Sequence, residues 1–167
     1  MDILIKDIQN RLSAEIPALK YVDEDWGQLD DYSPNPPVKW PCALIDINHV
    51  LYSNAGRHSQ LGEATITISV ADIKLTNSSS KAPAGQKQKQ TDYLQLIKSI
   101  HIALHGWHGH NHYSSLIRTI FKRVKRDDGV RQHLITYTCQ IQDTDSVKPT
   151  IKVPAALELI VEAPKEI

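Results

Sequence analysis

The chain has 167 residues, 41% of them hydrophobic and 23% charged, which is typical of one globular domain and excludes a disordered chain. The chain has 19 basic residues (lysine plus arginine) and 19 acidic residues (aspartate plus glutamate), so its formal net charge is zero. The chain as a whole therefore shows no bias toward nucleic acids or membrane surfaces. No window approaches the roughly 18 apolar residues of a membrane span, and the acid at position 2 is not typical of a signal peptide. We therefore expect a soluble protein made in a cytoplasm.

The first part of the chain predicts a helix, a short strand and an ordered, non-repetitive segment, residues 23–41, which we call the excursion. Apolar side chains recur at helical spacing over residues 2–15, and Pro17 ends that helix. Residues 18–22 can form a short strand. Residues 23–41 are rich in prolines and acids, but the two tryptophans among them favour ordered structure over a free linker.

Two strand patterns follow and predict an antiparallel hairpin. The first covers residues 42–52, and the second covers residues 63–75. The second pattern alternates most cleanly, because Ile66, Ile68 and Val70 are separated by hydroxyl side chains. The residues between the two strands supply the turn.

A second helix is predicted after a low-complexity stretch. Residues 76–90 contain no bulky apolar side chain, so we expect a mobile loop insertion there. Thr91 has the character of a helix N-cap, and apolar residues then recur at helical spacing. Gly106 stands where a C-terminal cap belongs, which predicts a helix over residues 91–105.

The last part of the chain predicts strands. Residues 115–126 and 130–143 flank an Asp-Gly turn, which is a strong hairpin signal, and one more strand is expected around residues 156–162. The order of elements indicates an α+β fold over a single domain, residues 1–167. We expect a mainly antiparallel β-sheet with two α-helices packed on one face.

The stretch "HIALHGWHGHNH" (residues 101–112) holds five of the eight histidines. His101 and His105 are one helical turn apart, so their side chains share a flank of the predicted helix and could bind zinc or nickel with a later histidine. Gly106 and Gly109 make the backbone of this stretch flexible, and the stretch contains no cysteine or carboxylate ligand. We therefore expect no metal and no cofactor, with His101 and His105 as the weak candidate ligands and a solvated loop after them.

Catalytic patterns are missing from the sequence. Cys42 and Cys139 each lie in an apolar, strand-like run, which predicts buried free thiols in a reducing compartment. No serine stands in a G-x-S-x-G elbow, and no glycine-rich phosphate loop is present. We therefore predict that the protein is not an enzyme.

Charge is unevenly distributed along the chain. A basic strand often only protects a sheet edge against aggregation, but it can also bind DNA phosphates or an acidic patch on another subunit. Segregated patches on a neutral chain suit head-to-tail self-association. The acids expected at such an interface are Asp23, Glu24, Asp25, Asp30 and Asp31, and the bases are Arg118, Lys122, Arg123, Lys125 and Arg126.

The order of these elements resembles a known family, the tail terminator (tail completion, minor tail) proteins of long-tailed bacteriophages and their prophages. The resemblance covers residues 3–162; the histidine-rich loop and residues 76–90 are not part of it. It is carried by the helix end "IPALKYV", the strand entry "PPVKWPCALIDI", the helix "YLQLIKSIHIALHGW" and the hairpin "RVKRDDGVRQHLITYTCQI".

The resemblance implies a small α+β subunit of the virion tail, assembled in the cytoplasm of a bacterial host. It implies a homo-oligomeric ring, typically a hexamer, that caps the tail tube and joins it to the head–tail connector. The implied partners are further copies of the chain, the tail tube protein and the connector proteins, with a passing contact to DNA and no membrane. It implies no reaction and no cofactor.

Two other functions stay open on the sequence. One is a nucleic-acid-binding module that uses the basic hairpin, residues 118–131, although Phe121 is the single aromatic residue on its basic arm. The other is a protein, or an enzyme, that binds a metal through its histidines.

Overall fold

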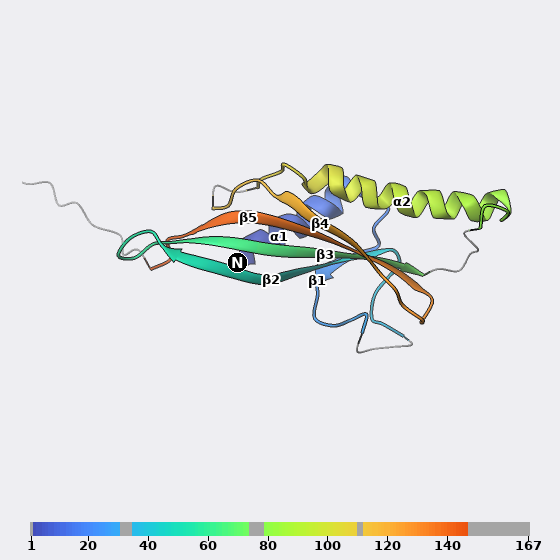
Figure 1. Ribbon diagram of the computed structural model, residues 1–167, viewed down its shortest axis with the longest axis horizontal. Coiled ribbons are helices and arrows are strands. Elements are labelled where there is room, and N and C mark those ends of the chain that lie inside the picture. The colour runs from blue at the N-terminus through green and yellow to red at the C-terminus, as the bar shows by residue number, and fades with distance from the viewer. Residues whose placement is uncertain (1, 31–34, 74–78, 110–111, 147–167) are drawn as a thin grey trace, which may run out of the picture.

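The computed structural model describes residues 2–30, 35–73, 79–109 and 112–146, which form two helices and a five-stranded sheet (Figure 1). The α+β fold predicted from the sequence is confirmed. None of the described helices is long and apolar enough to cross a membrane. The elements are α1 (Asp2–Glu15), β1 (Tyr21–Glu24), β2 (Cys42–Asn54), β3 (Gln60–Ile73), α2 (Ala84–Leu104), β4 (Ile117–Val124) and β5 (Val130–Asp143).

The strand order across the sheet is β1-β2-β3-β5-β4. Both predicted hairpins are present, since β2 pairs with β3 and β4 pairs with β5 in antiparallel register. β3 also pairs with β5 in antiparallel register, whereas β1 pairs with β2 in parallel. The sheet is therefore mainly antiparallel. This order places β1 and β4 at the two edges. The strand expected around residues 156–162 lies outside the described residues.

Both helices lie on the same face of the sheet, as the sequence predicted (Figure 1). Alternation in the strands produces this core, because every second side chain of a strand points to the helices. Burying one such isoleucine contributes roughly 1.5–3 kcal/mol. The sheet contributes Ala43, Ile45, Ala64, Ile66, Ile68, Val70, Ile135, Tyr137 and Cys139, and the helices contribute Leu4, Ile8, Leu12, Tyr93, Leu96, Ile97, Ile100, Ala103 and Leu104.

The other face of the sheet is covered at one end by the excursion after β1. Leu29, Cys42, Leu44 and Ala71 form a small buried cluster there. Gln28 is fully buried and satisfied, because its side-chain amide donates to the carbonyl of Glu24 at 2.7 Å and its oxygen accepts from the backbone of Trp26 at 2.8 Å. The described part of this excursion is therefore ordered, as its tryptophans indicated.

The start of α2 differs from the prediction. The helix begins at Ala84, seven residues before the expected N-cap Thr91, whose hydroxyl instead donates to the carbonyl of Lys87 inside the helix. None of residues 84–90 is buried, so hydrophobic periodicity could not reveal them, although alanine, glutamine and lysine form helices well. The interpretation of these residues as a loop was wrong. Residues 76–78 lie outside the described part of the chain.

Candidate subunit interface

The predicted bases gather at the β4 edge of the sheet. β4 is exposed on both sides along nearly its whole length. Within the described residues, none of Arg118, Lys122, Arg123 and Lys125 has an acidic partner at ion-pair distance. We call these four side chains the basic edge. They carry positive charge that the described fold leaves uncompensated.

The predicted acids gather at the β1 edge. Asp23 and Glu24 lie on β1, and Asp25 follows directly, with its backbone N–H bonded to the carbonyl of Ile45. We call these three carboxylates the acidic edge. Asp46 lies on the neighbouring strand β2, and burial, followed by the negative charge of Asp25, raises its pKa. Asp31, the remaining predicted acid of this stretch besides Asp30, lies outside the described residues.

The acidic and basic edges lie at opposite sides of one sheet. The strand order puts β1 first and β4 last. Four strand spacings of about 4.8 Å separate them by roughly 19 Å, which exceeds the screening length of about 8 Å at physiological ionic strength. The two edges therefore cannot neutralise each other within one chain.

Arg126 and Asp30 are an exception, because they meet within the chain. The Arg126 guanidinium pairs with the carboxylates of Asp30 and Asp128 and donates to the carbonyl of Leu29 at 2.6 Å. These contacts raise the pKa of Arg126, mainly through Asp128, and the same pair lowers the pKa of Asp128. Arg126 therefore ties the excursion after β1 to the β4–β5 turn. No local sequence pattern indicates this contact between residues 96 positions apart.

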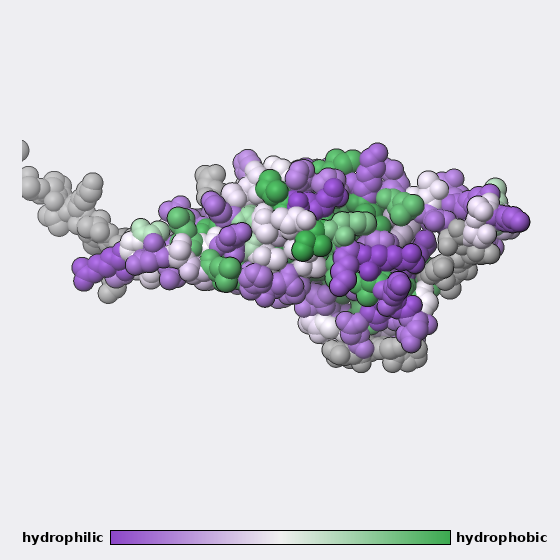
Figure 2. Space-filling model, viewed as in Figure 1, coloured by the Kyte–Doolittle hydropathy of each residue, from purple (hydrophilic) through white to green (hydrophobic). Residues whose placement is uncertain are grey.

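The apolar residues of β4 are part of the same edge and were not selected from the sequence. Ile117, Ile120 and Phe121 are 48%, 56% and 52% exposed. The Phe121 ring stacks on that of His133, with 5.3 Å between ring centroids, and His133 Nδ1 lies 3.0 Å from the Tyr93 hydroxyl. Figure 2 shows hydrophobic residues exposed among hydrophilic ones in the region of β4 and α2. The sequence signal that could have identified Ile117, Ile120 and Phe121 was the presence of large apolar residues in a strand rich in bases.

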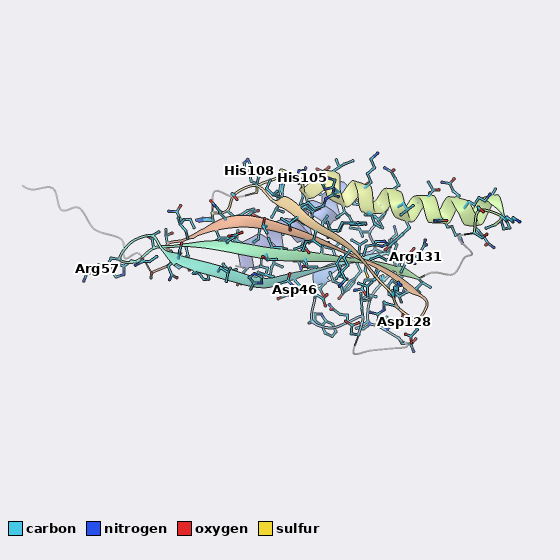
Figure 3. The ribbon with its side chains drawn as sticks, viewed as in Figure 1. Asp46, Arg57, His105, His108, Asp128 and Arg131 are labelled. Atoms are coloured by element: carbon cyan, nitrogen blue, oxygen red, sulfur yellow. The ribbon has the colours of Figure 1, made fainter. Side chains whose placement is uncertain are left out.

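His101 and His105 do share one flank of α2, with 4.9 Å between ring centroids. His105 lies at the end of the helix (Figure 3), where its Nδ1 accepts a hydrogen bond from the backbone N–H of Arg118 at 3.2 Å. Burial, and then the charges of Arg118 and His105, lower the pKa of His101. Among the described residues, which exclude His110, no group of three His, Cys, Asp or Glu side chains could hold a metal.

A cavity of about 360 Å³ lies between α2 and the end of the sheet, lined in part by Asp72, Tyr93 and Arg131. The Arg131 guanidinium stands 4.6 Å from the centroid of the Tyr93 ring and 3.9 Å from the Asp72 carboxylate. These groups neutralise one another. Burial raises the pKa of Asp72, and the charge of Arg131 opposes this shift, so the arrangement stabilises the packing of α2.

Comparison with known proteins gives a fold and no family. No family model and no curated protein matches the sequence. Among the solved structures that match is a chain from the virion of a native gene transfer agent particle, at a TM-score of 0.57 and 11% sequence identity. The match covers 84% of this chain and 95% of the other. The chain is similar in fold to a virion protein.

Proposed function

We propose that this protein is a non-enzymatic structural subunit of a phage-like particle, and that its copies associate head to tail. The observation that carries the proposal is the placement of the acidic edge and the basic edge at opposite sides of one sheet. The fold shared with a gene transfer agent virion chain supports a place in such a particle.

The two edges are different surfaces, so a contact between them is heterologous. Heterologous contacts repeat from copy to copy and close into a ring when the rotation between neighbours permits. Opposite charges set the orientation of such neighbours and speed their encounter more than they add affinity. A ring therefore also needs apolar contacts, and the exposed side chains of β4 can supply them.

At a finer level, we propose that the chain forms one domain and acts as a tail terminator. In that role a ring of copies, a hexamer in the family that the sequence resembles, caps the tail tube and joins it to the connector below the head. Its partners would be further copies of the chain, the tube protein and the connector proteins, within the virion tail. The sequence resemblance over residues 3–162 supports this role, and so does the shared fold.

Electron microscopy of the purified chain tests the proposal. At high protein concentration and low salt we expect rings of one size, because exposed charge contacts are then least screened. A parallel grid at high salt provides the control and should show fewer rings. Particles of monomer size under both conditions contradict the proposed self-association.

A further inference from the structure

The outer side of β4 is an unfilled strand edge. β4 pairs with β5 on one side, and the described residues provide no strand on its other side. The backbone N–H of Arg118 donates to His105, so residues 119–124 form the free part of the edge. A strand that only needed protection from aggregation would carry charges and no large apolar side chains. The half-exposed Ile120 and Phe121 give this edge apolar surface that an added strand would bury.

The two sides of β4 have different chemistry. Its pairing with β5 puts Arg118, Phe121 and Arg123 opposite Tyr137, Ile135 and His133, all on the helix side of the sheet. The same pairing leaves Ile117, Ile120, Lys122 and Val124 on the other side. A strand laid along β4 therefore has to match a base–aromatic–base row on one side and a mostly apolar row on the other.

The C-terminal segment, residues 156–162 ("ALELIVE"), has the complementary pattern. In an extended chain alternate side chains point to opposite sides. Glu158, Ile160 and Glu162 would then form an acid–apolar–acid row, and Leu157, Leu159 and Val161 an apolar row. The acid row matches the row of Arg118, Phe121 and Arg123. Both rows have charged ends and an apolar centre, so the order of their side chains is the same for parallel and antiparallel pairing. The three-residue step from Arg118 to Phe121 comes from the irregularity of β4 between Arg118 and Ile120.

We propose that residues 156–162 of a second copy add to β4 as a further strand. This inference rests on the proposed self-association and names the segment that would link neighbouring copies. The β1 strand of a neighbour has four residues and is too short to cover β4, which has eight. Two glutamates would meet Arg118 and Arg123, and Lys122 and Lys125 would stay available to the acidic edge of the neighbour.

The chain has enough length to reach a neighbour. The last described residue, Ser146, donates to the carbonyl of His58 in the β2–β3 turn, at the end of the sheet where Arg57 is labelled in Figure 3. Residues 147–155 then precede the segment. Nine residues span up to about 30 Å when extended. The segment can therefore lie up to about 30 Å from Ser146.

Cysteine pairs in the full-length chain test the proposal. Phe121→Cys and Ile160→Cys are made as separate proteins, mixed, and oxidised gently, and the products are separated on a non-reducing gel and identified by mass spectrometry. We expect a disulfide-linked dimer that joins positions 121 and 160. The native thiols should not compete, because burial raises the pKa of Cys42 to about 12 and that of Cys139 to about 11. Leu159→Cys, whose side chain would point to the other side, is the matched control and should link several-fold less.

The outcomes separate this inference from the proposed function. A link that forms only within one chain, in a Phe121→Cys/Ile160→Cys double variant, overturns the exchange between copies, and so does the absence of any link. Rings without the 121–160 link leave the proposed function standing and contradict the exchange. A linked dimer without rings supports the exchange between copies and contradicts the proposed ring. Glu158→Lys with Glu162→Lys should abolish the link, and Arg118→Glu with Arg123→Glu in the partner protein should restore it.

Discussion

Arg126 illustrates how a single side chain joins two parts of the fold. Its side chain is 13% exposed, and it binds the Leu29 carbonyl, Asp128 and Asp30. Asp30 is 71% exposed, so that pair is screened by solvent and adds little. The bond to Leu29 and the pair with Asp128 remain, and hydrogen bonds to charged groups are worth about 1.5–3 kcal/mol each.

Replacing Arg126 should therefore destabilise the fold. We expect Arg126→Ala to lower the free energy of unfolding by about 1–3 kcal/mol, measured by urea denaturation. Lys125→Ala is the matched control, since Lys125 is exposed and has no acidic partner among the described residues, and it should change stability by less than about 0.5 kcal/mol. Equal stability of the two variants would mean that the contacts of Arg126 do not hold the excursion in place.

His133 should make stability depend on pH. Burial, and then the charges of Arg123 and Arg131, lower its pKa below the ordinary value of 6.5, so the unfolded chain binds this proton more readily than the folded chain. The stabilisation is complete above the unfolded pKa and is lost as pH falls toward the folded one. We expect the free energy of unfolding to fall as pH is lowered from about 7.5 to about 5.5. His133→Gln should reduce this slope, and an unchanged slope in the variant would rule out His133 as its source.

At the scale of elements, the first two turns of α2 should contribute little to stability. Residues 84–88 are helical, yet none of them is buried, and Tyr93 is the first fully packed side chain of the helix. Replacing residues 84–88 with the same number of glycines and serines should reduce the helical signal in far-UV circular dichroism. The melting temperature should shift by no more than about 4 °C, which corresponds to roughly 1 kcal/mol for a chain of this size. A larger loss would show that this part of the helix packs against something.

The elements differ in how far the sequence predicts them. The β2–β3 and β4–β5 hairpins follow from alternation and turn residues, which act between neighbours in the chain. The N-terminal turns of α2 escape prediction because a helix that buries nothing has no apolar stripe. The parallel pairing of β1 with β2 and the contact of Arg126 with Asp30 depend on distant residues meeting in space, which no local pattern encodes.

The candidate interface was predicted in part. The sequence indicates two clusters of opposite charge, but their separation on the sheet depends on the strand order. Strand order also decides that β4 is an edge, and hence that Ile117, Ile120 and Phe121 are exposed rather than covered by a neighbouring strand. Residue types could be read from the sequence, whereas their placement at opposite edges required the fold.

At the scale of the whole molecule, the chain is neutral and its charges are separated across one sheet. Such a chain has no net repulsion between copies, and side-by-side neighbours present opposite charges to each other. Reversing two charges of one edge removes the electrostatic attraction between the two edges. Association should then fail for each reversed variant alone and return when the two variants are mixed.

Sedimentation velocity at low salt tests association through the two edges most directly. It compares the unaltered chain with two variants, Lys122→Glu with Lys125→Glu and Asp23→Lys with Glu24→Lys. An equal mixture of the two variants is the fourth sample. Circular dichroism first verifies that both variants are folded. We predict that the unaltered chain sediments as an oligomer that dissociates as salt is raised, that each variant sediments as a monomer, and that the mixture sediments as an oligomer again. An unaltered chain that remains monomeric at high concentration and low salt, or variants that associate as well as the unaltered chain does, would contradict self-association through the two edges.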